Sequence, residues 1–386
     1  MNFAIIGAGI GGLSTAHALL NVGHQVQVFE RAETIKEVGA GVVLGANAMH
    51  VLHHLGLHDA VRSAGHPVTS ISLLGQRGEV LNAADTQAFT KLIGFDNLAI
   101  HRATLQRVLL DTLPPGTLQL GKAFTHFSES PEAVTAHFAD GSSAQAAALI
   151  AADGLRSQVR LQLLPNSQPR YAGYTCWRAV LQAESLQLPA GKSAEIWGGK
   201  AGRFGYVPLA NGQVYWFACL NSPEPNNPRF RDFRVADLQR QFAAMPQPVP
   251  ELLALTTDAQ LLWNDILDLK PLRNFAFGRV LLLGDAAHAT TPNMGQGAGQ
   301  AIEDALALAR SLHLHPTNIN AAFQAFEARR RPRTTRIVEQ SWLMGRIGQL
   351  ENPLLTSVRD AVLRQTPASV SARQMAFLYQ GEGSDE

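Results

Sequence analysis

The run Gly7-Ala8-Gly9-Ile10-Gly11-Gly12 constrains the fold more than any other stretch of this chain. It has the GxGxxG spacing and lies between an apolar run over residues 3–6, predicted as a strand, and a helical pattern over residues 13–22. Gly7 permits a tight turn, Gly9 lets a pyrophosphate approach the backbone, and Gly12 lets the helix pack closely on the strand. We expect a dinucleotide at this helix N-terminus, with Gly11 among the contacts, because its free N–H groups attract phosphate.

An acidic residue completes this pattern. Residues 25–29 alternate as a strand does and end on Glu30, so the first thirty residues predict one βαβ unit. A carboxylate at this point accepts hydrogen bonds from a ribose 2′-OH, which argues against a 2′-phosphate. We therefore assign Glu30 and the adjacent Arg31 to the cofactor site, where NAD and FAD both remain possible.

A second pattern lies far along the chain. A buried strand pattern over residues 280–283 enters Gly284-Asp285, and a glycine-rich stretch then begins a helix. An NAD domain needs no such distant site. FAD does, because the acid binds a ribityl hydroxyl and the helix start stabilises negative charge at the N1/C2 edge of the reduced isoalloxazine. The pattern favours FAD, with contacts at Asp285, Pro292, Gly295, Gln296, Gly297 and Ala298.

Composition excludes several classes of protein. Charged residues make up 16% of the 386 residues and the formal net charge is +1, so the chain folds but has no field to gather nucleic acid or anionic lipid. Cys176 and Cys219 are too few for a disulfide framework, and no apolar stretch is long enough to span a bilayer. We expect a cytoplasmic monomer or homodimer whose partner is a small molecule.

The order of the patterns predicts an α/β fold in which a sheet-rich insertion interrupts a Rossmann-like FAD-binding domain. The middle of the chain is aromatic and alternating, as in Gln213-Val214-Tyr215-Trp216-Phe217, whereas the nucleotide-domain pattern returns after residue 279. We expect a FAD-binding domain over 1–70, 97–170 and 279–315, a substrate-binding domain over 71–96 and 171–278, and a C-terminal helical region with a short flexible tail over 316–386.

Three motifs in this order, Gly7 to Gly12, Asp153-Gly154 and Gly284-Asp285, resemble those of the single-component FAD-dependent monooxygenases, typified by para-hydroxybenzoate hydroxylase, salicylate hydroxylase and flavin-type urate hydroxylase. The resemblance implies tight, non-covalent FAD and no separate nicotinamide domain. It further implies that NAD(P)H reduces the flavin, that O2 then forms a C4a-hydroperoxide, and that this group hydroxylates a small electron-rich aromatic or heteroaromatic substrate. Salicylate-like aromatic acids and urate-like heterocycles are the first substrates we expect.

The resemblance also implies roles for single residues. Arg102, in His101-Arg102-x-x-Leu105, would contact the FAD pyrophosphate, and the backbone of Ala123 the adenine. Asp153 and Arg156 would serve the flavin and the transient NAD(P)H. Val43 lies in the flavin-facing loop over residues 39–47, which lacks the proline that relatives often have before the asparagine and is therefore expected to bend differently.

Arg203 and Tyr215 match positions at which urate hydroxylase has an arginine and a tyrosine facing its substrate. Because arginine holds a planar anion with two hydrogen bonds and a phenol relays a proton, we take both as candidate catalytic residues. The alternative is a surface arginine and a half-buried sheet tyrosine.

Asn293 departs from urate hydroxylase, which has an aspartate there. The run around Asn293 resembles that of zeaxanthin epoxidases instead, so an epoxidase of an alkene or isoprenoid remains open. A flavin reductase or dehydrogenase without oxygen insertion and a non-catalytic flavin-binding sensor are further alternatives.

Three other polar features are interpreted as structural. Without nearby carboxylates or thiolates, the helical histidines predict a solvated face and no metal site; they are His50, His53, His54 and His58. The arginines between Arg329 and Arg336 predict a solvated helix face paired with local acids such as Glu327 and Glu339. His288 follows the flavin acid and is interpreted as a packing residue, with a role as general base as the alternative.

Overall fold

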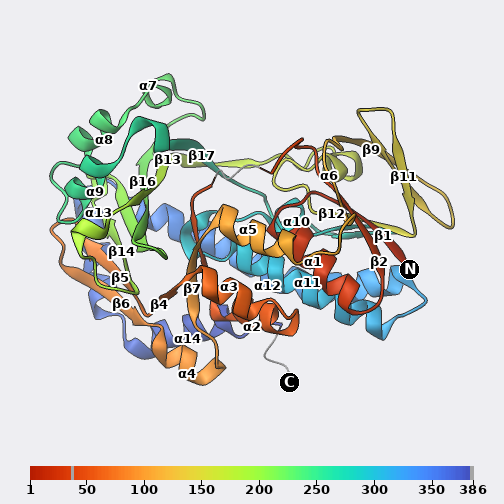
Figure 1. Ribbon diagram of the computed structural model, residues 1–386. Helices are drawn as coiled ribbons and strands as arrows, with labels where there is room; N and C mark the ends of the chain where they lie inside the picture. The colour runs from red at the N-terminus through yellow and green to blue at the C-terminus, as the bar shows by residue number, and fades with distance from the viewer. Residues whose placement is uncertain (36–38, 383–386) are drawn as a thin grey trace.

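The computed structural model describes residues 1–35 and 39–382, and Figure 1 shows the arrangement of its elements. A six-stranded sheet has the order β18-β19-β12-β1-β2-β8. β1 pairs in parallel with both β2 and β12, and β12 pairs in parallel with β19. The strands are β1 (Asn2–Ile6), β2 (Gln25–Phe29), β8 (Leu118–Gln119), β12 (Ala148–Ala151), β18 (Ala276–Phe277) and β19 (Val280–Leu282).

The central strands of this sheet are apolar and are buried in the core. All residues of β12 and β19 and the last four of β1 are inaccessible to solvent, as is typical of parallel strands covered on both faces. The same core contains apolar side chains of helices α1 (Ile10–Asn21) and α11 (Gly297–Leu314) and of a small antiparallel sheet. That sheet consists of β9 (Phe124–Glu129), β10 (Val134–Phe138) and β11 (Ser143–Ala146).

A seven-stranded sheet occupies the other end of the molecule (Figure 1). Its order is β17-β13-β16-β15-β14-β5-β6, and only the β14–β5 pairing is parallel within it. The strands are β5 (Ser70–Gly75), β6 (Val80–Asp85), β13 (Arg170–Gln182), β14 (Lys192–Trp197), β15 (Arg203–Pro208), β16 (Gln213–Asn221) and β17 (Leu262–Asp268).

The period of two along β16 separates the two faces of this sheet. Val214, Trp216 and Ala218 enter a core shared with the short helices α7 (Pro228–Arg231), α8 (Val235–Gln241) and α9 (Val249–Leu255). Tyr215 points to the opposite face and packs with Val43 of β3, which belongs to the N-terminal half of the molecule. The seven-stranded sheet therefore presents its second face to that half, and we call this second face the inner face.

The remaining elements connect the two sheets. A three-stranded sheet consists of β3 (Gly41–Leu44), β7 (Asn97–His101) and β4 (His66–Val68). The other helices are α2 (Ala46–His54), α3 (His58–Ala64), α4 (Gln87–Ile93), α5 (Arg102–Asp111), α6 (Gln158–Leu163), α10 (Asp285–His288), α12 (Ile319–Gly348), α13 (Pro353–Gln365) and α14 (Ala368–Tyr379).

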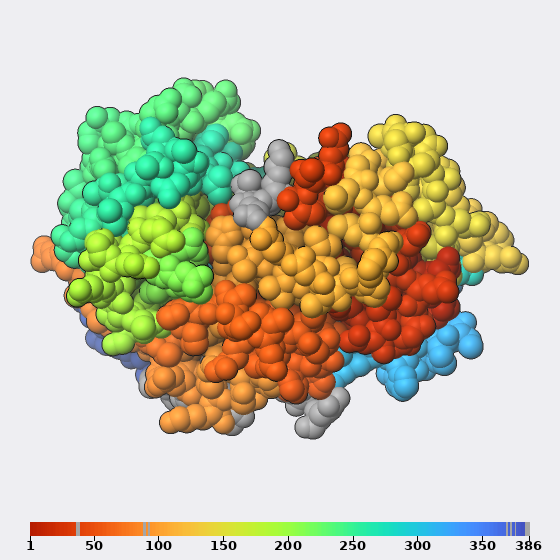
Figure 2. Space-filling view, viewed as in Figure 1, coloured from red at the N-terminus to blue at the C-terminus, as the bar shows by residue number. Residues whose placement is uncertain are grey.

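The long helix α12 contacts both large sheets. Near its start, the Glu327 carboxylate accepts hydrogen bonds from the N–H groups of Phe275 and Ala276 beside β18. At its end, Gln349 exchanges hydrogen bonds with Asn221 of β16. Figure 2 shows the two ends of the molecule that α12 contacts. Residues 171–278, in green, lie at one end, and the red and yellow N-terminal segments lie at the other.

The strand pairing departs from the expected domain limits most clearly at β18. β18 lies within the segment 171–278 but pairs antiparallel with β19 of the six-stranded sheet. β18 therefore belongs to the six-stranded sheet. Along the described part of the chain, no helix combines the length and apolar character needed to cross a membrane.

The prediction of a solvated arginine face on α12 is wrong for Arg330 and Arg333, whereas Arg329, Arg331 and Arg336 are exposed. Arg330 is fully buried and pairs with Glu303 (2.6 Å) and Asp304 (2.7 Å) of α11, and Arg333 pairs with Glu303 (2.9 Å). These partners come from a different helix, so the spacing of charges along α12 itself could not reveal them. The expected partner Glu327 instead binds the backbone beside β18.

The expected flexible tail is also partly wrong. Glu382 is buried and its carboxylate pairs with Arg329 at 2.5 Å and with Arg330 at 3.5 Å. A buried carboxylate held by two guanidinium groups fixes the chain at this point. Residues 383–386 of the expected tail lie outside the described residues.

The helical histidines are not simply solvated. The rings of His50, His53 and His58 lie 4.6, 5.3 and 5.4 Å from the ring of Phe95, and His50 stacks on His54 at 5.0 Å. These contacts make the cluster an aromatic packing feature between α2 and the segment before β7.

Candidate active site

The glycine-rich turn between β1 and α1 brings three parts of the backbone into close contact. A Cβ on Gly12 would lie 2.0 Å from the carbonyl oxygen of Gly7, and Gly7 itself has φ +105° and lies against Ala152. A Cβ on Gly9 would meet nothing within 4 Å. Gly9 is also the N-cap of α1, whose first turn has no side-chain cap and no acid, so its N–H groups are available to an anion.

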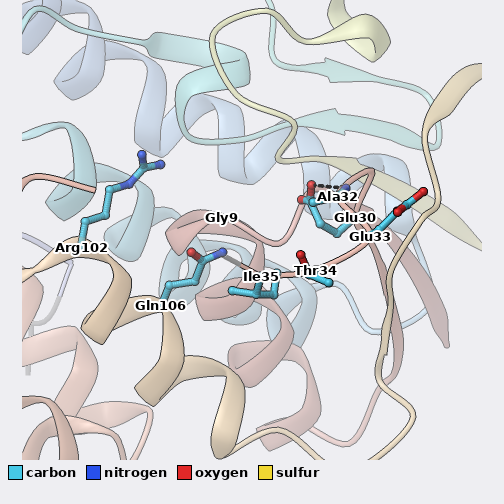
Figure 3. A pocket seen from close by; sticks show the side chains of 8 residues that line it. All are labelled: Gly9, Glu30, Ala32, Glu33, Thr34, Ile35, Arg102 and Gln106. Carbon is cyan, nitrogen blue, oxygen red and sulfur yellow. Dashed lines mark hydrogen bonds between the residues drawn. The ribbon is translucent and has the colours of Figure 1, made fainter. Parts of the chain in front are cut away.

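A cavity of about 560 Å³ opens beside this helix start. Figure 3 shows Arg102 and Gln106 projecting from α5 on one side and Glu30 and Glu33 lying on the other. The Glu30 carboxylate accepts hydrogen bonds from the N–H groups of Ala8 and Ala32, both at 3.0 Å, and keeps lone pairs for a ribose hydroxyl. The first motif thus supplies a phosphate end and a ribose end within one cavity.

The expected adenine and pyrophosphate contacts flank this region. Arg102 is exposed at the start of α5, and Arg31 is exposed directly after Glu30. Ala123 lies just before β9, where its carbonyl oxygen accepts a hydrogen bond from the Ala139 N–H at 2.8 Å.

Asp153 lies behind the glycine-rich turn. One of its carboxylate oxygens accepts hydrogen bonds from the N–H groups of Gln158 (2.8 Å) and Val159 (3.3 Å), while the other is buried without a partner among the described residues. Burial raises the pKa of this carboxyl, although the surrounding hydrogen-bond donors act in the opposite direction. An unpartnered oxygen here fits a ligand hydroxyl.

A buried arginine connects this segment to the second cofactor motif. Arg160 is fully buried and donates to the carbonyl oxygens of Leu155 (2.6 Å) and Ala286 (3.0 Å). Since Leu155 follows Asp153-Gly154 and Ala286 follows Gly284-Asp285, one side chain fixes the two motifs relative to each other. Arg156, the other expected contact, is exposed.

Asp285 is the exposed residue in an otherwise buried stretch, 280–289. It lies at the start of α10, after Gly284 with φ +57°. A little further on, α11 begins at Gly297 without an acid in its first turn, and Gly295 is left-handed with open space around it. Pro292, Gly297 and Ala298 line the same stretch and are at least partly accessible, whereas Gln296 is buried. His288 is buried and binds Asp304, so it packs as expected.

Arg203 lies on the inner face of the seven-stranded sheet and is buried, which excludes the surface reading. Its Nε donates to Glu195 Oε1 at 2.6 Å, its Nη2 also pairs with Glu195, and its Nη1 donates to Asn293 Oδ1 at 2.9 Å. Burial acts to lower the pKa of Arg203, but the Glu195 carboxylate and smaller contributions from Cys219 and Tyr174 together raise the pKa above its ordinary value.

Asn293 joins this face to the second cofactor motif. Its Oδ1 accepts from Arg203 and from the Tyr174 hydroxyl (3.2 Å), and its Nδ2 donates to Thr291 Oγ1 (2.8 Å) and to the Ser341 carbonyl oxygen (3.0 Å). All of its hydrogen-bonding capacity is used. Helix α12 approaches this network closely because it has glycines there: Gly345 lies against Asn293 and Gly348 lies against Arg203.

Tyr215 lies against β3. A Cβ on Gly41 would be 2.5 Å from the ring of Tyr215, and Val43 of the same strand packs with it. Burial raises the pKa of this phenol well above its ordinary value, so it is protonated at neutral pH. The structure thus brings Tyr215 and Val43 together, and links Arg203 to the 292–297 loop through Asn293.

Comparison with known proteins agrees with this arrangement. The model of a family described as "FAD binding domain" matches residues 1–341. The aurachin C monooxygenase/isomerase of Stigmatella aurantiaca is 40% identical over 93% of each chain. The chain belongs to the FAD-dependent monooxygenases. This confirms the expected fold class, cofactor and type of enzyme.

Two further members of this monooxygenase family resemble the chain over nearly its full length. The 2-heptyl-3-hydroxy-4(1H)-quinolone synthase of Pseudomonas aeruginosa is 31% identical over 99% of each chain. The crystal structure of Klebsiella pneumoniae HpxO complexed with FAD and uric acid matches with a TM-score of 0.91 and 32% identity, covering 99% of this chain and 97% of that one.

The residues of this monooxygenase fit FAD. The cavity beside Gly9, the unpartnered Asp153 oxygen, the exposed Asp285 carboxylate and the uncapped starts of α1 and α11 offer the donors and acceptors that the cofactor needs. The sequence patterns did not indicate three residues that support the site. Arg160 and Asp304 bind partners on elements distant in sequence, and Glu195 binds Arg203 across the pairing of β14 with β15; no local sequence pattern signals these contacts.

Proposed function

We propose that this enzyme is an NAD(P)H-dependent monooxygenase that hydroxylates a planar heteroaromatic ring carrying a hydroxyl or oxo group, with 4(1H)-quinolones as the first class to test. Bound FAD supplies the chemistry, taking a hydride from NAD(P)H and delivering one oxygen atom of O2. The protein supplies binding, orientation and exclusion of water.

The ion pair between Arg203 and Glu195 carries this proposal. A benzoate-type substrate needs an arginine whose fork is free to bind the carboxylate with two hydrogen bonds. Here Glu195 already takes two nitrogens of Arg203, and Asn293 takes the third. Because its charge is compensated inside the protein, Arg203 suits a ring without a carboxylate better than a carboxylic acid.

The remaining groups of the site agree with such a ring. Tyr215 is a protonated phenol, and Asn293 is neutral where urate hydroxylase has an aspartate. The ring of Phe217 covers Gly205, where an added Cβ would lie 2.2 Å from the ring, and so offers a flat apolar wall on the inner face. We propose that Tyr215 donates to, or relays a proton from, the oxygen of a ring that packs along this wall.

The relatives give independent support. The Pseudomonas aeruginosa relative is named for a 3-hydroxy-4(1H)-quinolone that it synthesises, and it covers 99% of this chain. The ring carbon next to the carbonyl of a 4(1H)-quinolone is electron-rich, which oxygen transfer from a reduced flavin requires.

A screen tests the proposal. FAD-loaded protein is mixed with NADH or NADPH and with aromatic acids, purines or 4(1H)-quinolones, and donor oxidation, oxygen uptake and product mass are measured. We expect quinolones to accelerate donor oxidation and to yield a product heavier by one oxygen atom. Oxygenated products from carboxylic acids alone would overturn the proposed substrate class, and donor oxidation without any oxygenated product would favour a reductase.

A further inference from the structure

A second arginine lies on the inner face of the seven-stranded sheet. Arg178 of β13 is flanked on its own strand by Cys176 and Val180, which pack on the inner face, while the alternate residues Trp177 and Ala179 enter the opposite core. Its register partner on β16 is Phe217. Arg178 therefore shares the face that carries the flat wall of the proposed substrate site.

The partners of Arg178 differ from those of Arg203. Its Nη2 donates to the neutral side chain of Asn264 at 2.6 Å, and its Nε is buried without an acceptor among the described residues. No carboxylate within residues 1–35 and 39–382 forms an ion pair with it. Arg178 thus keeps an uncompensated charge and an unmet donor, and an unmet buried donor costs free energy that a ligand oxygen would recover.

The charge of Arg178 affects the pKa of Tyr215, a residue of the proposed substrate site. Burial raises the pKa of Tyr215 most strongly, and the charge of Arg178 acts against this rise. Val180, two residues along β13 from Arg178, is the register partner of Tyr215, so the two side chains are diagonal neighbours on one face. A ring oxygen placed between them would meet a phenol on one side and a guanidinium on the other.

We propose that Arg178 binds the ring oxygen of the heteroaromatic substrate and is a specificity-determining residue of this enzyme. This inference rests on the proposed function and adds the residue that distinguishes rings with such an oxygen from rings without it. A guanidinium beside the oxygen stabilises its negative charge when the ring loses a proton, which makes the ring carbon a better nucleophile.

The test compares 4(1H)-quinolone, which carries this oxygen, with quinoline, which lacks it. FAD-loaded protein is titrated with 4(1H)-quinolone and with quinoline, and binding is followed by the change in flavin absorbance. The wild type, Arg178→Gln and the control Arg231→Gln are compared; Arg231 is exposed on α7 and its replacement removes the same charge. The ratio of the two dissociation constants is the readout, because a general loosening of the site would weaken both rings.

We expect the wild type and Arg231→Gln to bind the quinolone at least about 10-fold more tightly than quinoline, and Arg178→Gln to lose most of this ratio while keeping FAD. An unchanged ratio in Arg178→Gln would overturn the role of Arg178 and leave the proposed function standing. A wild type that binds neither ring would overturn the proposed function and this inference with it. Should the glutamine variant lose FAD, Arg178→Met is measured in its place, and the same results decide.

Discussion

Nε of Arg330 on α12 lies 2.7 Å from Oδ1 of Asp304 on α11, and both side chains are fully buried. The other carboxylate oxygen of Asp304 accepts the Gly284 N–H at 2.9 Å and contacts His288 Nε2 at 2.7 Å. The turn that positions Asp285 is therefore held by an ion pair contributed by two later helices.

We expect Arg330→Ala to destabilise the protein by about 3–5 kcal/mol, because it leaves Glu303 and Asp304 buried without their main cationic partner. FAD should also dissociate more readily, since the Gly284-Asp285 turn loses its support. Denaturant unfolding and FAD retention measure the two effects. Arg331→Ala, at an exposed neighbouring position, is the control and should change stability by less than about 0.5 kcal/mol. Equal stabilities of the two variants would contradict the structural role of the pair.

Low pH should lower the free energy of unfolding, because Asp304 becomes protonated. Burial acts to raise the pKa of this carboxyl, but His288 and Arg330 outweigh it and hold the pKa at about 2, below its ordinary value of 3.8. A depressed folded-state pKa adds stability that is present above pH 3.8 and is lost as the pH falls toward 2. Unfolding free energies measured across this range should fall less steeply for Asp304→Asn than for the wild type. The exposed control Glu132→Gln should keep the wild-type slope, and a parallel curve for Asp304→Asn would count against the assignment.

Substitutions at two glycines of the first motif should distinguish an effect on cofactor binding alone from an effect on folding. Gly9→Ala meets no protein atom within 4 Å, so the fold should remain while the methyl group occupies the path of the pyrophosphate and lowers FAD affinity. Gly12→Ala would place a methyl group 2.0 Å from the Gly7 carbonyl oxygen and should lower both stability and FAD content. Melting temperature and flavin absorbance report the two properties. Full FAD content in Gly9→Ala would show that no phosphate approaches this backbone.

Removing the counterion of Arg203 should change the preferred substrate. In Glu195→Gln the guanidinium loses its only carboxylate partner among the described residues, so it becomes available to an anionic ligand. We expect the affinity for salicylate, measured by flavin absorbance, to rise by about 10-fold. Glu224→Gln, exposed in the same sheet-rich segment, should leave it unchanged. No gain in Glu195→Gln would mean that the ion pair does not select against carboxylates.

The cofactor-binding half of the fold could be predicted from sequence because its signals are local. A strand, the GxGxxG turn, a helix and Glu30 follow one another within thirty residues, and each glycine has one steric task. The alternation of β16 likewise separates Tyr215 from Trp216 without further information. These predictions were possible because the motif residues are close in sequence and because side chains along a strand alternate with a period of two.

The polar network could not be predicted because its partners lie on different elements of the fold. Arg330 pairs across two helices, Asn293 binds residues of β13, β15 and α12, and Glu195 reaches Arg203 only through the pairing of β14 with β15. The charges along α12 suggested local pairs, but burial against α11 made the long-range pairs the stable ones. The same holds for Glu382, which is buried although the end of the chain is polar in sequence.

The most direct test of the account is a single turnover under isotope-labelled dioxygen. FAD-loaded protein, NAD(P)H and a 4(1H)-quinolone are combined, and the product is analysed by mass spectrometry. We expect one labelled oxygen atom in the hydroxylated ring. A product whose new oxygen comes from water, or donor oxidation that yields only hydrogen peroxide with every ring tested, would contradict it.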